Sequence, residues 1–239
     1  MHVRAPGADF LRNTTPQGLG RALHGAVFGE PRRHGKWLLE PADNHLLLFH
    51  FGMTGSLHWT SHPESDPPDS HDQVVFETDA GELRTRSQRK FGGVWLLAGS
   101  SIDYQRVTGP LGPDAAELAH GDFRALLSRR HGPIKGALMD QALLAGLGNQ
   151  LSDEILWRAG IHPERNADEL SPEQLAEIYR AMRHVLRESM RRGHIPVEPG
   201  WLQKVRDDQN ARCPRCGGPL SKKHIAGRSA RLCPSCQPP

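Results

Sequence analysis

The sequence predicts an α+β protein in which a β-rich first part precedes a helical part, and a cysteine-bearing hairpin follows them. Three observations lead to this prediction. Short apolar or alternating runs dominate the chain up to Leu97, a helical periodicity begins after a Pro/Gly-rich stretch at 108–114, and all four cysteines lie between Cys213 and Cys236. Strands repeat every two residues and helices about every 3.6, so the change of period marks a change of structure.

The first part, residues 1–107, predicts a β-sandwich or another two-layer β structure. Alternating and short apolar runs are typical of half-buried and buried strands. Such runs occur at 36–40, 45–52, 56–60, 73–78, 82–87 and 94–98. A loop rich in Pro, Ser and Asp at 61–72 separates the third run from the fourth, and we expect it to be mobile.

The helical part spans residues 108–205 and begins with a linker that marks a domain boundary. Its last helix is the clearest, because Ser171 and Gln174 form a capping box, Pro172 takes the first helical position and Gly193 closes the helix. The outer face of this helix carries Arg180, Arg183, Arg187 and Arg191. These arginines form either a solvated face or a binding face.

Composition and charge exclude some classes of protein. No apolar run approaches the ~18 residues that a membrane span needs, and the N-terminus has no apolar signal region. We therefore expect no membrane partner and a cytoplasmic protein, where paired cysteines bind metal more often than they form disulfides. The net charge of +3 says little, because the position of the charges matters more than their sum.

The four cysteines follow the pattern C-x2-C-x16-C-x2-C, which is typical of a four-cysteine zinc ribbon. Each C-x2-C turn aims two thiolates at one point, and two such turns complete a tetrahedron around Zn²⁺. The predicted ligands of one structural zinc are Cys213, Cys216, Cys233 and Cys236. An iron–sulfur cluster or a redox dithiol is the alternative.

The segment between the two cysteine pairs is basic and has no acidic residue. It carries Lys222, Lys223, His224, Arg228 and Arg231. Such a hairpin suits a phosphate backbone, and a merely solvated loop is the alternative.

A glycine turn precedes a predicted helix at Asn149. Gly146 and Gly148 allow a phosphate to approach the backbone, and Asn149 can cap the helix that follows. The N-terminus of a helix attracts anions, so the turn is a candidate phosphate site. An ordinary contact between two helices would also explain it.

Taken together, these segments resemble the formamidopyrimidine-DNA glycosylase and endonuclease VIII family, over about Arg32 to Gln237. The matching segments come in the family's order. They are RRHGKWLLE, FHFGMTGSL, HDQVVF, QRKFGGVWL, LGPD, IKGALMDQALLAGLGNQLSDEILWRAGIHP and the cysteine hairpin. The resemblance implies a catalytic-type β-sandwich at 1–107, a helix–two-turn–helix domain at 108–205 and a zinc-finger hairpin at 206–239.

The resemblance also implies a function. Members of this family repair DNA by base excision: they remove oxidised or ring-opened bases and nick the abasic site. The expected partner is double-stranded DNA with a damaged base or an abasic site, and the expected protein is a monomer at the nucleoid. An RNA-binding or zinc-dependent interaction protein would share the tail, but not the ordered series of motifs.

Individual site residues follow from the resemblance. Met53 resembles the wedge residue that enters the duplex where the damaged base leaves, and Arg89 and Phe91 resemble its two companions. Inserted side chains replace part of the stacking that is lost when a base is extruded. Without the resemblance, Met53 and Phe91 would be interpreted as core residues.

The remaining expected contacts are with the DNA backbone. Lys36 resembles the active-site lysine near the lesion phosphate, and His71 resembles a residue that contacts the backbone. The expected phosphate contacts around the flipped nucleotide are Lys135, Asn149 and Arg228.

The beginning of the chain departs from the family pattern. Family members start, after removal of Met, with a proline whose amine attacks the sugar C1′ and a glutamate that handles protons. Here the sequence begins MHVRAPG, and the nitrogen of Pro6 is an amide. Two expectations follow. Either the true start lies upstream, with the first helix of the catalytic domain, or the chain is a non-catalytic, zinc-dependent binder of damaged or abasic DNA. For the chain as given, Lys36 is the candidate substitute amine.

Overall fold

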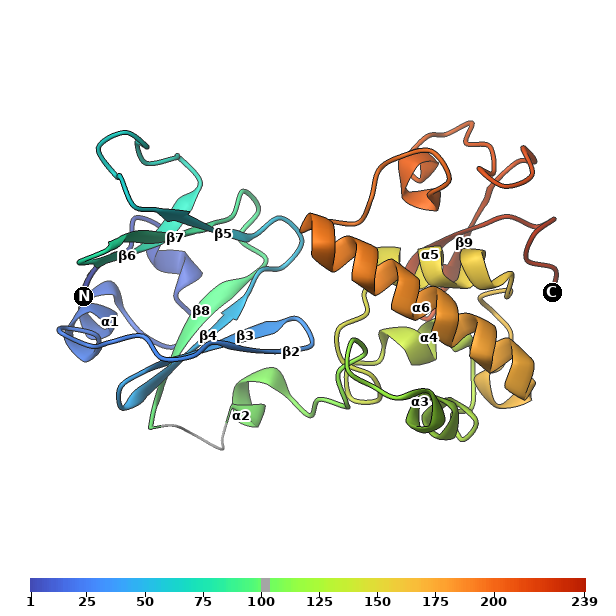
Figure 1. Cartoon of the computed structure of the whole chain (residues 1–239), viewed down its shortest axis with the longest axis horizontal. Coiled ribbons are helices and arrows are strands. Elements are labelled where there is room, and N and C mark those ends of the chain that lie inside the picture. Colours follow the sequence, from blue (N-terminus) through green and yellow to red (C-terminus); the bar gives the residue numbers. More distant parts are fainter. Residues whose placement is uncertain (100–103) are drawn as a thin grey trace. The chain divides into compact units, whose positions relative to one another are not determined.

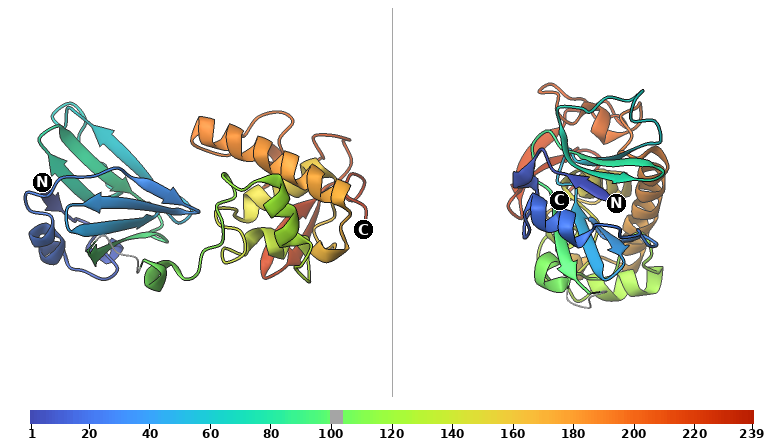
Figure 2. Two further views of the ribbon diagram at one scale, coloured as in Figure 1. Left: turned by 60° about the horizontal axis from the view of Figure 1, so that its bottom comes forward. Right: turned by 90° about the vertical axis from the view of Figure 1, so that its left-hand side faces the viewer.

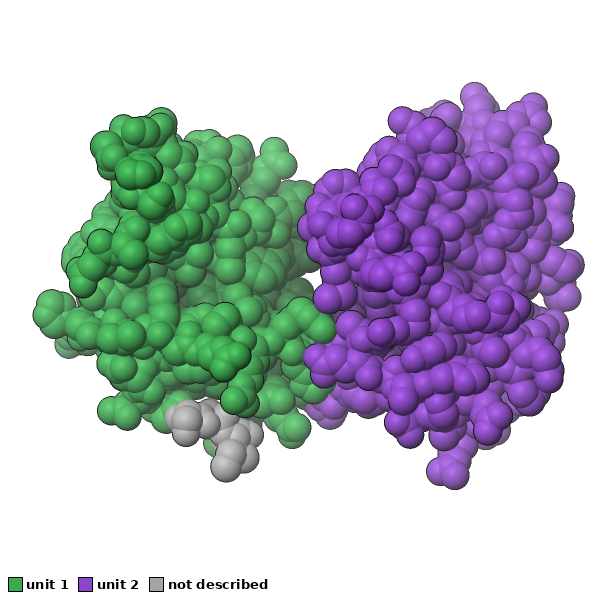
Figure 3. Space-filling model, viewed as in Figure 1, with its two compact units in different colours: residues 1–109 green, residues 110–239 purple. Residues whose placement is uncertain are grey.

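The computed structural model describes residues 1–99 and 104–239, which form two compact units, 1–109 and 110–239 (Figures 1 and 3). Each unit has its own hydrophobic core. Among the described residues, no helix combines the length and apolar character that crossing a bilayer requires.

Unit 1 contains two four-stranded antiparallel sheets (Figures 1 and 2). One sheet has the order β1 (His2–Arg4), β6 (Asp72–Thr78), β7 (Gly81–Arg86) and β5 (Ser56–Thr60). The other has the order β2 (Arg32–His34), β3 (Trp37–Ala42), β4 (His45–His50) and β8 (Gly93–Ala98). Phe49 of β4 meets Phe76 of β6 edge to face at 5.9 Å between ring centroids, so the core joins the two sheets.

Short helices complete unit 1. The helix α1 (Pro16–Ala22) begins at Thr15, whose hydroxyl accepts a hydrogen bond from the amide of Gly18. Leu19 and Leu23 are fully buried in the core of this unit. A 3-10 turn (Ala8–Phe10) precedes α1, and α2 (Gln105–Thr108) ends the unit.

Unit 2 packs four helices around a second core: α3 (His120–Leu127), α4 (Ile134–Met139), α5 (Asn149–Ala159) and α6 (Pro172–Arg192). The capping box of Ser171 and Gln174 is present, and Gly193 ends α6 in the left-handed conformation, as predicted. Two 3-10 turns (Ala167–Glu169 and Leu202–Val205) fill the connections.

The cysteine hairpin belongs to unit 2 and consists of β9 (Ser221–Ile225) and β10 (Arg228–Leu232). Its turn has positive φ at Ala226 (49°) and Gly227 (74°), the combination that a tight two-residue hairpin needs. A Cβ placed on Gly136 of α4 would lie 3.1 Å from the Cβ of Ala226. The tip of the hairpin is therefore held close to α4.

The structure confirms the predicted α+β class, the β-sheet first part, the helical second part and the cysteine hairpin. Each of the six predicted strands is present within a few residues of its expected bounds. The helix α1 and the strand β2 were not predicted.

Candidate nucleic-acid interface and zinc site

The four cysteine sulfurs lie close enough together to hold one metal ion. They all lie within 4.8 Å of one another, with 3.8 Å between the Sγ atoms of Cys213 and Cys236 and 3.5 Å between those of Cys216 and Cys233. A zinc tetrahedron with Zn–S bonds of about 2.3 Å has sulfurs roughly 3.8 Å apart. The site therefore fits one structural Zn²⁺ held by all four thiolates.

The surroundings of these thiols favour thiolate at one of them and oppose it at another. Burial raises the pKa of the Cys213 thiol, but hydrogen bonds from the backbone of Cys216 and Arg215 and from the Trp157 indole outweigh it, and the pKa falls to about 6. Burial and the neighbouring sulfurs raise the pKa of Cys236 to about 12. Four thiols this close cannot all ionise without a cation, so zinc binding must release protons.

Lys135 was expected to contact a DNA phosphate, but it is buried inside the protein. Its side chain is fully buried, and its ammonium donates to Asp153 Oδ1 at 2.5 Å and to the carbonyl of Ser229 at 2.8 Å. A phosphate cannot reach an ammonium enclosed in this way. The expectation that Lys135 contacts DNA is corrected: this lysine holds α4 to the hairpin.

Asp153 is the centre of this buried network, and sequence reasoning missed it. Its second carboxylate oxygen accepts from the Arg206 guanidinium and, at 3.1 Å, from the backbone amide of Arg231. Burial lowers the pKa of Lys135, and the carboxylate of Asp153 opposes that shift. One carboxylate on α5 thus joins α4, the segment at Arg206 and the strand β10.

Of the other two expected phosphate contacts, Arg228 is exposed and Asn149 is half-buried. Gly148 is the N-cap of α5, so Asn149 occupies the first helical position and does not cap the helix as expected. Its Oδ1 is buried without a hydrogen-bond partner among the described residues. Arg228 is exposed at the start of β10 and directly precedes Ser229, whose carbonyl Lys135 holds.

The glycine turn before α5 is held by one side chain. Gln141 accepts from the amide of Gly146 at 3.1 Å and donates to the carbonyl of Leu147 at 2.9 Å. Gly146 has a φ of 112°, a backbone angle that residues with a side chain rarely adopt. The first amides of a helix have no partner within the helix, so this rigid turn presents unpaired N–H groups.

In unit 1, the strand register brings Lys36 to one end of the second sheet. Trp37 pairs with His50 and His50 pairs with Gly93, so the turn before β3, the end of β4 and the start of β8 share that end. Lys36 is exposed in the turn. Burial lowers the pKa of His50, and the positive charge of Lys36 lowers it further.

Two loops meet at this end of the sheet. A Cβ on Gly52 would lie 2.9 Å from the carbonyl carbon of Phe91, and one on Gly92 would lie 1.9 Å from the carbonyl oxygen of His50. Glycine alone permits this approach of the loop 51–55 to the loop 87–92. We call the surface formed by these two loops the loop rim.

The expected wedge residues all lie on the loop rim. Met53 and Phe91 are each 66% exposed, which excludes the interpretation that they are core residues. The guanidinium carbon of Arg89 lies 5.9 Å from the centroid of the Phe91 ring. The rim therefore presents two large apolar side chains and one cation.

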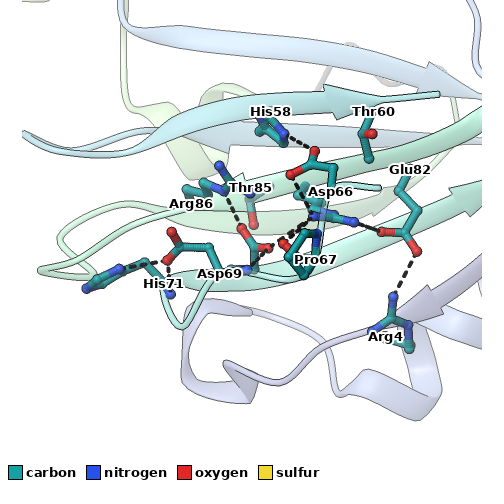
Figure 4. A network of polar contacts seen from close by, with 12 residues as sticks. Arg4, His58, Thr60, Asp66, Pro67, Asp69, His71, Glu82, Thr85 and Arg86 are labelled. Atoms are coloured by element: carbon teal, nitrogen blue, oxygen red, sulfur yellow. Dashed lines mark hydrogen bonds and ion pairs between the residues drawn. The ribbon is translucent and has the colours of Figure 1, made fainter. Parts of the chain in front are cut away.

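His71 belongs to a polar network with Asp69 (Figure 4), and its backbone also contacts Ser87, at the start of the loop 87–92. Its carbonyl accepts from the amide of Ser87 at 3.0 Å, and its ring lies 2.8 Å from Asp69 Oδ1. The loop 61–72 that carries His71 is anchored along its length: Asp66 meets His58 at 2.6 Å, and the fully buried Arg84 donates to the carbonyl of Pro67 at 3.2 Å. The sequence predicted a mobile loop and gave no sign of these anchors.

Several arginines of α6 have partners within the protein, in α6 itself or at Ala116. Arg180 pairs with Glu177, Arg191 pairs with Glu188 at 2.7 Å, and Arg183 donates to the carbonyl of Ala116. These exposed pairs support the interpretation of a solvated face.

Three family models match the chain in succession. They are the formamidopyrimidine-DNA glycosylase N-terminal domain at residues 2–94, the formamidopyrimidine-DNA glycosylase H2TH domain at 111–198, and a zinc finger found in FPG and IleRS at 212–239. With the zinc ligands and the loop rim, these models define a zinc-finger protein of the base-excision class of DNA glycosylases.

Similar proteins agree with this class. Formamidopyrimidine-DNA glycosylase of Pelotomaculum thermopropionicum is 37% identical over 220 residues, covering 86% of this chain and 79% of that protein. The enzyme of the same name from Symbiobacterium thermophilum is 38% identical over 231 residues, covering 90% and 75%. The chain belongs to the formamidopyrimidine-DNA glycosylase family.

Solved structures show the same fold. The Lactococcus lactis Fpg in complex with DNA containing an abasic site is similar with a TM-score of 0.83 and 26% identity, over 100% of this chain and 92% of that one. The same values hold for the L. lactis Fpg in complex with DNA containing Fapy-dG.

Proposed function

We propose that this protein binds double-stranded DNA at a damaged base or an abasic site, excises oxidised or ring-opened bases and nicks the resulting abasic site. The loop rim is the observation that carries this proposal. Two exposed apolar side chains on glycine-locked loops, with a cation beside them, suit insertion into a duplex at an extruded nucleotide. Relatives that bind abasic and Fapy-dG DNA support it.

Backbone contacts come from both units in this proposal. Lys36 and His71 supply them from unit 1, and Asn149 and Arg228 supply them from unit 2. The first amides of α5 add uncharged donors beside Asn149, as at other phosphate-binding helix ends. Lys135 is left out of this set, because it acts on the hairpin and not on the DNA.

The chemistry requires an uncharged amine. The amine attacks C1′, the bond to the base breaks as the iminium forms, and proton loss from C2′ then expels the 3′ phosphate. Lys36 is the candidate amine at the loop rim. A lysine amine is mostly protonated at neutral pH, and a nearby DNA phosphate favours the protonated form further.

The second candidate function is binding of damaged or abasic DNA without excision. The loop rim supports this function as well, because its exposed side chains can hold an extruded nucleotide whether or not excision follows.

Borohydride trapping on an abasic-site duplex separates the two functions. Reduction fixes a covalent adduct when an amine of the protein attacks C1′, and it fixes none when the protein only binds. Binding should be measured on the same duplex, so that a missing adduct is not mistaken for missing recognition. Failure to prefer abasic over intact duplex would overturn both candidates.

A further inference from the structure

We propose that Trp157 is part of the zinc site: its indole N–H holds the Cys213 thiolate and strengthens zinc binding. Trp157 Nε1 lies 3.3 Å from Cys213 Sγ, and the side chain is almost fully buried. A buried indole N–H needs an acceptor. In the described part of the chain, the hydrogen bond of this N–H goes to the sulfur.

The charge of the loaded site explains why such a donor matters. Four thiolates around Zn²⁺ carry a net charge of about −2. On one side of the site, Trp157 and Leu202 pack against the buried Cys213 and Cys233. A donor aimed at one sulfur spreads the negative charge and fixes the orientation of the ligand.

Two guanidinium groups lie close to the indole ring. The guanidinium carbon of Arg215, inside the first C-x2-C turn, lies 4.8 Å from the Trp157 ring centroid, and that of Arg158 lies 5.7 Å away. Arg215 also donates to the carbonyl of Arg158 at 2.9 Å, near the end of α5. In the folded hairpin, the metal turn and the helix thus hold the ring in place, with its N–H directed at the sulfur of Cys213.

Trp201 provides a matched control. It is also buried, and its ring centroid lies 4.1 Å from the guanidinium carbon of Arg158. It makes no hydrogen bond to a cysteine among the described residues. Replacing Trp201 by Phe removes an indole from the same stack and leaves the zinc ligands untouched.

The test compares Trp157→Phe with Trp201→Phe in competition with a chromophoric zinc chelator. We expect Trp157→Phe to weaken zinc binding about tenfold and Trp201→Phe to leave it within about twofold. With Co²⁺ in the site, the thiolate-to-metal charge-transfer band should shift in Trp157→Phe alone, because a sulfur without its hydrogen bond is a better electron donor. A loss of packing alone, with the hydrogen bond to Cys213 kept, would not move that band.

Equal weakening in both variants, or an unmoved cobalt band in Trp157→Phe, would overturn the proposal. A third measurement needs no variant and covers the case in which Trp157→Phe does not fold. In the zinc-loaded wild-type chain, the Nε1 proton of Trp157 should exchange slowly with water in NMR spectra. Rapid exchange in the loaded protein would also overturn the proposal.

Discussion

Arg228 and Lys135 are two cations at the same hairpin, but their surroundings in the structure predict different roles in DNA binding. Arg228 is exposed, whereas Lys135 is enclosed by Asp153 and the carbonyl of Ser229. Arg228→Ala should weaken binding to an abasic duplex and lower the salt dependence by about one counterion. Binding isotherms over a series of salt concentrations measure both quantities.

Lys135→Met should weaken the same binding without changing its salt dependence, because the lysine acts by holding the hairpin backbone. It also leaves Asp153 with Arg206 and the amide of Arg231 as partners. Lys204→Ala, at an exposed cation far along the chain, is the control for a general loss of charge. If Lys135→Met lowered the salt dependence of binding, Lys135 would be a phosphate contact after all.

Glu40 is a buried carboxyl whose Oε1 has no partner among the described residues. Burial raises its pKa from 4.5 to about 7. The folded state therefore binds this proton more tightly, and the stability that the group contributes is complete below pH 4.5 and is lost as pH rises through 7.

Glu40→Gln should remove this pH dependence and stabilise unit 1 at pH 8 by roughly 1–3 kcal/mol. Urea unfolding at pH 5 and pH 8 measures the effect, with the exposed Glu30→Gln as control. An unfolding free energy of unit 1 with the same pH dependence in Glu40→Gln as in wild type would contradict the assignment.

Single residues show where sequence reasoning ended. The zinc ligands were predictable because their spacing is local and the chemistry of thiolates is specific. The burial of Lys135 was not, because it depends on Asp153, Arg206 and Ser229, which lie far away in the sequence. A basic residue in a phosphate-binding motif and one in a buried ion pair look the same in a sequence.

At the scale of elements, the zinc hairpin should fold only with its metal. Cys216→Ser removes one ligand, and zinc binding and local folding are coupled. We expect zinc loss and rapid proteolysis within the hairpin, while unit 1 keeps its unfolding transition, since its core shares no residue with the hairpin. Elemental analysis and limited proteolysis test this; unchanged zinc content would contradict the ligand set.

The loop rim should affect the discrimination between abasic and intact duplex more than the overall affinity for DNA. Met53→Ala and Phe91→Ala should reduce the preference for abasic over intact duplex several-fold, since base–side-chain stacking contributes ~1–3 kcal/mol. Competition binding with both duplexes measures the ratio. Val27→Ala, at an equally exposed apolar side chain outside the rim, should leave it unchanged.

Elements were predictable to the extent that their pattern was repeated. The strands β3 to β8 carry enough alternation or apolar length to be found. The helix α1 has a capping residue, Thr15, and a proline at its first position, Pro16. Its two glycines and short apolar face weaken the helical pattern, so the sequence did not predict it. The anchoring of the loop 61–72 depends on Arg84. This charged residue is fully buried, and no local sequence pattern predicts that burial.

At the scale of the whole molecule, excision of oxidised bases and nicking should both be slow at neutral pH and faster at higher pH, with Lys36 as the attacking amine. A lysine amine beside a phosphate is largely protonated at neutral pH, so only a small fraction can attack C1′. Borohydride adducts should disappear in Lys36→Ala. Efficient excision by Lys36→Ala would show that the active site lies elsewhere.

The concentration of every cysteine in one metal site also has a practical side. A thiolate that shares its lone pair with zinc reacts slowly with maleimides, so the loaded protein offers dyes no ordinary free thiol. A cysteine introduced at Glu64, whose side chain is 70% exposed on the loop that carries His71, would then be the preferred target. A single fluorophore there could follow the loop in real time while DNA binds, without any native cysteine having to be removed first.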